Sequence, residues 1–168
     1  MSARRCLPSI AGMSTTIRIA LHSELSPERL LAPAYDFSDH RPEIFPAVSE
    51  EHMEVHHVAD SWADVTEGTP AGVGVNWERC RYDWSKPGSV TATVTDSNVY
   101  AVPGSSWTIT AAARDDGTDV EMIWVREFRH GARGRIFATA YKVIGKPIFG
   151  RYAREVLGNI EGRQAAAS

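Results

Sequence analysis

The chain has 168 residues, of which 43% are apolar and 23% charged, a balance that predicts one globular domain with a substantial core. No apolar run approaches the roughly 20 residues of a membrane-spanning helix. The two cysteines, Cys6 and Cys80, lack metal-type spacing, and we expect a reducing, cytoplasmic compartment and no metal centre.

The two ends of the chain are interpreted as extensions of the domain. Residues 1–13 contain two arginines but lack the apolar stretch of a signal peptide, so we predict a disordered leader with Met13 as an alternative start. Residues 161–168 are predicted to be a frayed tail. The single domain is therefore expected over residues 14–160.

The first elements are a strand and two short helices. Residues 15–21 alternate apolar and polar side chains, which predicts a half-buried strand. Ser26 precedes Pro27, a typical start of a helix, and we expect this helix to run to about Phe37. A second short helical turn is predicted over residues 41–46.

Alternating segments separated by turn sequences then predict six antiparallel strands. They span residues 53–58, 62–67, 73–84, 89–97, 107–113 and 120–128. The sequence D-D-G at 115–117 predicts a tight hairpin before the last strand. In that strand Met122, Trp124, Arg126 and Phe128 share one face, which we interpret as the inner face of the sheet.

Apolar residues at spacings of three and four predict a long helix from residue 133 to residue 160. They are Phe137, Tyr141, Ile144, Ile148, Tyr152 and Val156. Pro147 interrupts this pattern, so we expect a kink or break near Gly145. The order of elements indicates an α+β fold in which a curved antiparallel sheet wraps around the C-terminal helix.

Three segments of the chain resemble the START-like superfamily, also called the helix-grip or Bet v 1-like fold. They are W-T-I-T-A-A-A-R-D-D-G-T-D-V-E-M-I-W-V at 107–125, H-G-A-R-G-R-I-F at 130–137 and K-P-I-F-G-R-Y-A-R-E-V-L-G-N-I at 146–160. Within the superfamily the chain is most similar to the polyketide cyclase/dehydrase and lipid-transport-like branch. One departure lies near Asp36–His40, where many members carry a tryptophan and this chain has Phe37 and Phe45.

This resemblance covers residues 14–160 and implies a helix-grip fold with about six to seven strands. It also implies a cavity between the sheet and the last helix, often used for a lipid, a polyketide or another apolar metabolite. Carriers, cyclases and regulatory binding modules share this fold, so the fold alone does not fix the function.

Arg126 is the first candidate site residue, because a cation on the inner face must be paired or must face a ligand. It could hold a carboxylate, or polarise a carbonyl in a cyclisation or dehydration. The alternatives are that the alternation ends near Arg126, which then faces water, or that it pairs with a core acid such as Asp64.

The segment E-E-H-M-E-V-H-H at 50–57 contains three histidines, His52, His56 and His57. The first two share a face, but the sequence fixes no third ligand, so a metal site is not favoured. His56 could act as an acid or base in a pocket, since the histidine pKa lies near neutral. The favoured interpretation is an exposed edge strand with solvated histidines.

Aromatic and apolar side chains supply the expected walls of the cavity. Of the five tryptophans, Trp77, Trp107 and Trp124 are best placed to contact a ligand. The full predicted set of ligand-binding residues is Trp77, Trp107, Met122, Trp124, Arg126, Tyr141 and Ile144. Tyr141 could also turn its hydroxyl into the cavity, although buried tyrosines usually serve as packing.

The charge of the chain, −3 overall, is unevenly distributed. Residues 20–69 carry eleven acids and two bases, whereas residues 126–154 carry eight bases and one acid. The favoured interpretation is a solvated helix face paired with the acidic half; a weak contact with an anionic membrane through Arg133, Arg135, Arg151 and Arg154 is the alternative. No nucleic-acid-binding motif occurs, and no nucleic-acid partner is expected.

Three functions follow from these features. The first is a protein that binds or carries a small hydrophobic metabolite or lipid. The second is a cyclase or dehydratase for a polyketide-like substrate, with Arg126 stabilising an enolate and His56 or Tyr141 moving protons. The third is a membrane-surface or protein-interaction module that uses the basic last helix. No cofactor is expected, because the sequence has no phosphate loop or dinucleotide fingerprint.

Overall fold

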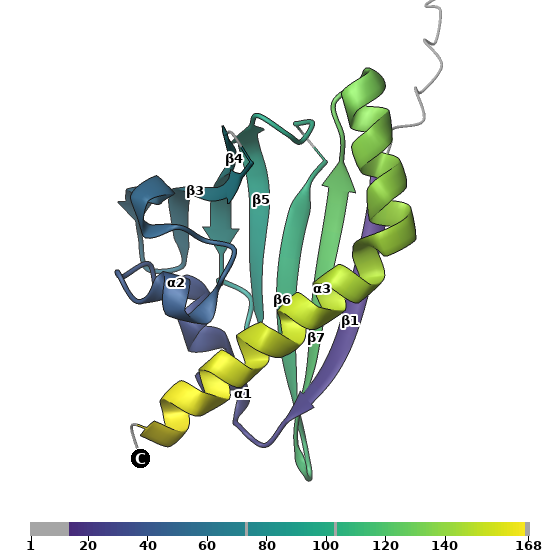
Figure 1. Ribbon diagram of the computed structural model, residues 1–168. Coiled ribbons are helices and arrows are strands. Elements are labelled where there is room, and N and C mark those ends of the chain that lie inside the picture. Colours follow the sequence, from purple (N-terminus) through teal and green to yellow (C-terminus); the bar gives the residue numbers. More distant parts are fainter. Residues whose placement is uncertain (1–13, 73, 103, 167–168) are drawn as a thin grey trace, which may run out of the picture.

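The computed structural model describes residues 14–72, 74–102 and 104–166, without the side chain of Arg133. One antiparallel sheet has the strand order β1-β7-β6-β5-β4-β3-β2, and a long helix crosses one of its faces (Figure 1). The strands are β1 (Ser14–Ser23), β2 (Glu54–Val58), β3 (Trp62–Ala71), β4 (Gly74–Asp83), β5 (Ser89–Ser97), β6 (Ser106–Arg114) and β7 (Gly117–Glu127). The helical elements are α1 (Pro27–Leu31), η1 (Ala32–Tyr35), α2 (Arg41–Ile44), η2 (Glu50–His52) and α3 (Ala132–Ala166).

The first helix is shorter than the sequence predicts. It begins at Pro27, as expected, but α1 ends at Leu31 and the chain continues as the 3-10 turn η1 to Tyr35. Pro33 is the physical reason, because a proline has no backbone N–H to donate to the carbonyl of the preceding helical turn. The short helices close one end of the sheet, where Leu30, Ala34 and Phe45 are buried.

The hairpin between β6 and β7 sets the register of the last strand. Gly117 has a φ of 141°, and a Cβ atom at this position would lie 2.3 Å from the carbonyl oxygen of Ser23. Glycine is therefore required in this turn. Along β7 the buried residues alternate as the sequence predicts, and Trp124 and Arg126 both lie on the buried face.

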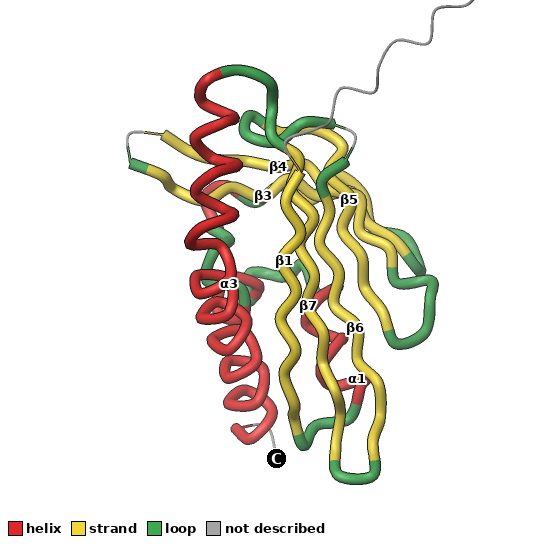
Figure 2. Tube along the Cα trace, turned by 90° about the vertical axis from the view of Figure 1, so that its right-hand side faces the viewer, coloured by secondary structure: helices red, strands yellow, loops and turns green. Residues whose placement is uncertain are grey.

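The C-terminal helix α3 changes direction near Pro147 but is not broken (Figure 1). Pro147 cannot donate a hydrogen bond to the preceding turn, which explains the kink. Gly145 brings the helix close to β1, since a Cβ atom there would lie 2.6 Å from Cδ1 of Ile17. Figure 2 shows α3 and β1 side by side.

The end of α3 differs from the frayed tail that the sequence predicts after Ile160. The helix continues to Ala166, and Ser23 donates a hydrogen bond of 2.6 Å to Glu161. The predicted leader over residues 1–13, with Cys6, lies outside the described residues. Among the described residues, no helix is long and apolar enough to cross a membrane.

The hydrophobic core lies between the sheet and the second half of α3. Ala153, Val156, Leu157 and Ile160 are buried there. A buried arginine, Arg41, joins the short helices to this core. Its guanidinium donates to Glu67 on β3, to the hydroxyl of Tyr82 on β4, and to backbone carbonyls of the α1–α2 segment.

Candidate ligand-binding cavity

A cavity of about 540 Å³ lies between the first half of α3 and the inner face of the sheet. This volume is typical of pockets for small molecules. Its walls come from the segment before η2, from β3, β4 and β7, from the residues after β5, and from α3. The lining residues are Ala47, Val48, Glu67, Thr69, Asn76, Trp77, Glu78, Val99, Tyr100, Trp124, Arg126, Phe137, Ala140, Tyr141, Ile144, Gly145, Ile148, Phe149 and Tyr152.

Aromatic rings form much of the apolar wall. The ring centres of Trp124 and Phe149 are 4.8 Å apart, and those of Tyr141 and Phe149 are 5.5 Å apart. Phe149 therefore links the tryptophan of the sheet to the tyrosine of the helix. Such flat, rigid side chains provide a large contact area for an apolar ligand.

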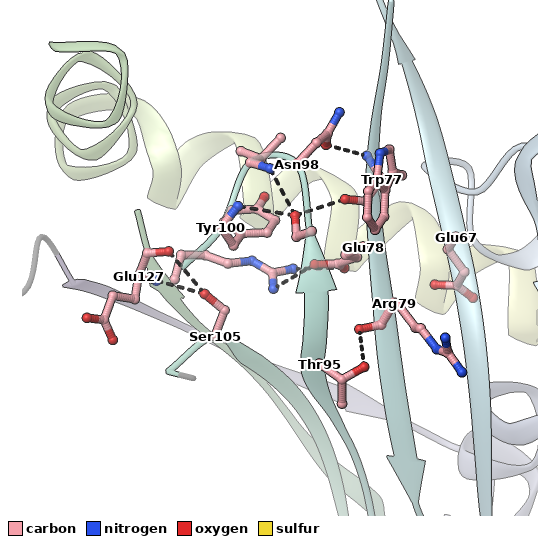
Figure 3. Close-up of polar contacts among 12 residues, drawn as sticks. Glu67, Trp77, Glu78, Arg79, Thr95, Asn98, Tyr100, Ser105 and Glu127 are labelled. Atoms are coloured by element: carbon pink, nitrogen blue, oxygen red, sulfur yellow. Dashed lines mark hydrogen bonds and ion pairs between the residues drawn. The ribbon is translucent and has the colours of Figure 1, made fainter. Parts of the chain in front are cut away.

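A buried ion pair, Arg126 with Glu78, forms the polar part of the cavity. The two terminal nitrogens of Arg126 lie 3.2 and 3.5 Å from the carboxylate oxygens of Glu78 on β4. The guanidinium carbon also lies 4.5 Å from the ring centre of Tyr100, a cation–π contact. Figure 3 shows Glu78 between Tyr100 and Glu67, with dashed lines to its carboxylate.

Two buried polar atoms lack a hydrogen-bond partner within the described part of the chain. They are Nε of Arg126 and Oγ1 of Thr15. Thr15 on β1 is directly opposite Arg126 on β7, so the two side chains are neighbours on one face of the sheet. A buried polar group without a partner costs about 1–3 kcal/mol. Of the two residues, Arg126 also lines the cavity.

The ionisation of Glu78 differs from that of an exposed carboxyl group. Burial raises its pKa and outweighs the attraction of Arg126, and the negative charge of Glu67 raises the pKa further. Glu67 lies directly opposite Glu78 in the β3–β4 pairing. For Arg126, burial alone would lower the pKa, but the negative charge of Glu78 overrides this effect and raises it, so the guanidinium stays charged.

Two tyrosines are joined beside this ion pair. The hydroxyls of Tyr100 and Tyr141 lie 2.9 Å apart and share a hydrogen bond. Burial raises the pKa of Tyr100 well above its usual value, so its hydroxyl keeps its proton at neutral pH. The same cause raises the pKa of Tyr152, which lines the cavity from α3. These hydroxyls can therefore act as hydrogen-bond donors to a ligand.

Ile144 and Ile148 define the mouth of the cavity. Both line it, yet they are 49% and 55% exposed. Large apolar side chains that face both a cavity and the solvent indicate an opening on this side of α3.

No family model matches the chain, and no curated protein matches its sequence. Among solved structures, a protein from Thermus thermophilus aligns with a TM-score of 0.70 and 16% identity over 92% of this chain and 99% of that one. The Zhui aromatase/cyclase from a Streptomyces species aligns with a TM-score of 0.69 and 13% identity, covering 92% and 98% of the two chains. A START superfamily protein from Mycobacterium smegmatis aligns with a TM-score of 0.65 and 10% identity, covering 91% and 99%.

This chain has the START-like helix-grip fold. The long C-terminal helix, the seven-stranded antiparallel sheet and the short helices after β1 all agree with the fold predicted from the sequence. At these identities the comparisons concern the fold alone, so the roles of individual residues depend on the geometry of the cavity.

In the START-like fold of this chain, five of the predicted ligand-binding residues line the cavity. They are Trp77, Trp124, Arg126, Tyr141 and Ile144. Trp107 and Met122 do not line it. Trp107 packs against Phe45 and Tyr82 beneath the short helices, and Met122 belongs to the filled part of the core. Both share the inner face with cavity residues but lie further along the strands.

Two alternatives that the sequence left open, an acid–base role for His56 in the pocket and pairing of Asp64 with Arg126, differ from the structure, whereas the favoured exposed edge strand agrees with it. His56 lies on the exposed edge strand β2, away from the cavity, and its Nε2 is 2.8 Å from the Thr66 hydroxyl. A register shift between Val55 and His57 alters the alternation on which its predicted position depended. Asp64 does not pair with Arg126; it accepts two hydrogen bonds from Arg79 instead. No cluster that would hold a metal occurs among the described residues.

Glu78, Tyr100 and Thr15 were not predicted from the sequence. Cys80 and Tyr82 are buried on β4, and Glu78, two residues before Cys80, lines the cavity together with Trp77. The apolar residues Cys80 and Tyr82 were the feature of the sequence that could have identified the buried face of β4. Tyr100 follows β5 in a loop, where periodicity gives no orientation.

Proposed function

We propose that this protein binds a small, mostly apolar molecule in the cavity under α3, with an oxygen of the ligand held by Arg126. The observation that carries the proposal is the unpartnered Nε of Arg126, buried in the wall of an otherwise largely aromatic and aliphatic cavity. A ligand with one acceptor group and an apolar body would satisfy both features.

The size of the cavity and the structural neighbours support this proposal. About 540 Å³ accommodates a lipid fragment or a compound of several fused rings. One neighbour is an aromatase/cyclase, another a START superfamily protein, and a third is a major latex-like protein from Panax ginseng. A lipid or a polyketide-like aromatic compound is therefore the ligand class that we favour.

The test is titration with 8-anilinonaphthalene-1-sulfonate, an aromatic probe with a fixed negative charge. We expect saturable binding, which is measured as quenching of the fluorescence of Trp77 and Trp124, the tryptophans that line the cavity. The double variant Arg126→Met/Glu78→Met removes the inner ion pair without leaving one charge alone. It should weaken binding about tenfold, the effect of losing one charged hydrogen bond.

The matched control is Arg79→Met/Asp64→Met, which removes an ion pair outside the cavity. This control should bind the probe like the parent protein. Equal binding by the parent and by the inner double variant, with both folded by circular dichroism, would contradict the role of Arg126.

A second candidate function is cyclisation or dehydration of a polyketide-like substrate, and Glu78 is the observation that favours it. A carboxyl group whose pKa is raised by burial can give and take a proton nearer to neutral pH. Beside it, the Arg126 guanidinium would stabilise the enolate formed when a proton leaves the carbon next to a carbonyl. Tyr141 would contribute a hydrogen bond, whereas His56 lies too far from the cavity to take part.

One variant distinguishes an enzymatic function from a carrier function. Glu78→Gln keeps the shape of the side chain, so binding of a synthetic poly-β-ketone thioester should persist while its conversion to a cyclic product is lost. Conversion at an unchanged rate would remove Glu78 from the chemistry. Absence of conversion by the parent protein would leave the carrier as the function.

A further inference from the structure

We propose that the first half of α3 docks this protein onto an anionic lipid bilayer, with the mouth of the cavity against the bilayer surface. The docking face consists of Arg135, Ile136, Lys142, Val143, Ile144, Lys146 and Ile148. It does not depend on which ligand the cavity binds.

The apolar part of this face is unusually exposed. Ile136 is 69% and Val143 is 72% exposed, and their spacing of seven residues places them on one side of the helix. Ile144 and Ile148 continue this surface to the mouth of the cavity. Of the large apolar side chains that are exposed in the described chain, only Val55, Val58 and Val102 lie elsewhere. Such a concentration on one helix indicates a surface that is covered in use.

The cationic part of the face lies along its edge. Arg135, Lys142 and Lys146 are exposed, and spacings of seven and four residues align them in one row. None of the three forms an ion pair with a described residue, and residues 128–154 contain no acid. The expected pairing with the acidic half of the chain is not what the structure shows, because Glu67 and Asp64 pair with Arg41 and Arg79. From α3, Arg163 alone reaches an acid of that half, Glu43, among the described residues.

This arrangement matches a helix that lies in a membrane interface. Such helices bury an apolar strip at the level of the lipid headgroups and place lysines and arginines beside anionic phosphates. No described element covers the outer side of the first half of α3 (Figures 1 and 2). With the cavity mouth on the same surface, an apolar ligand would pass between bilayer and cavity without crossing water.

The experiment is co-sedimentation of the unliganded protein with vesicles of phosphatidylcholine alone or with about 30% phosphatidylserine. We expect binding to the anionic vesicles only, and loss of that binding at high salt. Lys142→Glu/Lys146→Glu should weaken binding at least about tenfold. The control Arg29→Glu/Lys86→Glu makes the same change in net charge at exposed positions elsewhere and should have less than about a twofold effect.

A second pair of variants separates apolar insertion from charge alone. Ile136→Ser/Val143→Ser should also weaken binding about tenfold, whereas Val55→Ser/Val58→Ser, on the exposed edge strand β2, should not. Failure of the parent protein to bind anionic vesicles at low salt would overturn the proposal. Equal losses in the control variants, or binding to polyglutamate but not to vesicles, would overturn it too.

Discussion

Two buried Arg–Glu pairs lie on the inner face of the sheet, and they differ in how completely their hydrogen bonds are made. Glu67 and Glu78 are cross-strand neighbours. Glu67 is held by Arg41, all of whose guanidinium nitrogens have partners. Glu78 is held by Arg126, whose Nε has none among the described residues.

The two halves of α3, which lie above the two ion pairs, differ in how fully they are packed. After Pro147, α3 buries Ala153, Val156 and Ile160 against the sheet, whereas before it Ile144 is half exposed at the mouth of a cavity. A filled region with satisfied polar groups contributes stability. A hollow region with an unsatisfied donor can gain free energy when a ligand or a water enters, and the proposed binding site rests on this difference.

The largest expected effect is the loss of stability on replacing Arg41. Arg41→Met removes the cation that pairs with Glu67, which keeps only the Tyr82 hydroxyl as a donor, and it leaves several backbone carbonyls without theirs. We expect a loss of about 3–5 kcal/mol in the free energy of unfolding. Arg126→Met should cost less, about 1–3 kcal/mol, because the raised pKa of Glu78 makes its protonation easier and Arg126 donates to no backbone carbonyl among the described residues. Urea unfolding of both variants measures the difference, and equal losses would mean that the two pairs are equivalent.

Two alanines of α3 give the next contrast. Ala153 is completely buried, so Ala153→Leu should overpack the core and cost about 1–3 kcal/mol. Ala140 lines the cavity, and Ala140→Leu should change stability by less than about 0.5 kcal/mol while weakening probe binding. A loss of stability in Ala140→Leu as large as in Ala153→Leu would show that the first half of α3 is packed like the second.

The smallest expected effect is the pH dependence due to Glu78. The pKa of Glu78 is raised in the folded protein, so this group contributes to the free energy of unfolding below its unfolded-state pKa of 4.5. That contribution is lost as the pH rises through the pKa of the folded state. Glu78→Gln removes this titration. The stability of the parent protein relative to this variant should therefore fall between pH 4.5 and neutral pH, as followed by urea unfolding. Parallel pH profiles would contradict the raised pKa.

Much of the fold follows from periodicity, since β5 begins and ends where the alternation of its residues predicts and D-D-G marks the turn before β7. The inner position of Arg126 followed from the same alternation. The end of α1 at Leu31 was not predicted, although Pro33 lacks the backbone N–H that a longer α-helix would require.

The cavity could be predicted only in part. Residues on regular strands and on α3, such as Trp124 and Tyr141, were found because period and spacing give their direction. Glu78 was not predicted because strict alternation from Trp77 would direct it to the other face of β4, whereas both residues line the cavity. The partners of Arg126 and Asp64 depend on distances across the sheet that no pattern along the chain contains. The division between filled and hollow regions likewise depends on packing in three dimensions.

The most direct test of the central claim is native mass spectrometry of the parent protein and of Ala140→Trp, each mixed with the same extract of apolar metabolites. The account predicts a bound molecule on the parent protein, recovered by denaturing extraction, and a clearly smaller bound fraction on the variant, because the added indole takes up part of the cavity. An equal bound fraction on both proteins, or no bound molecule on either, would contradict a ligand site under the first half of α3.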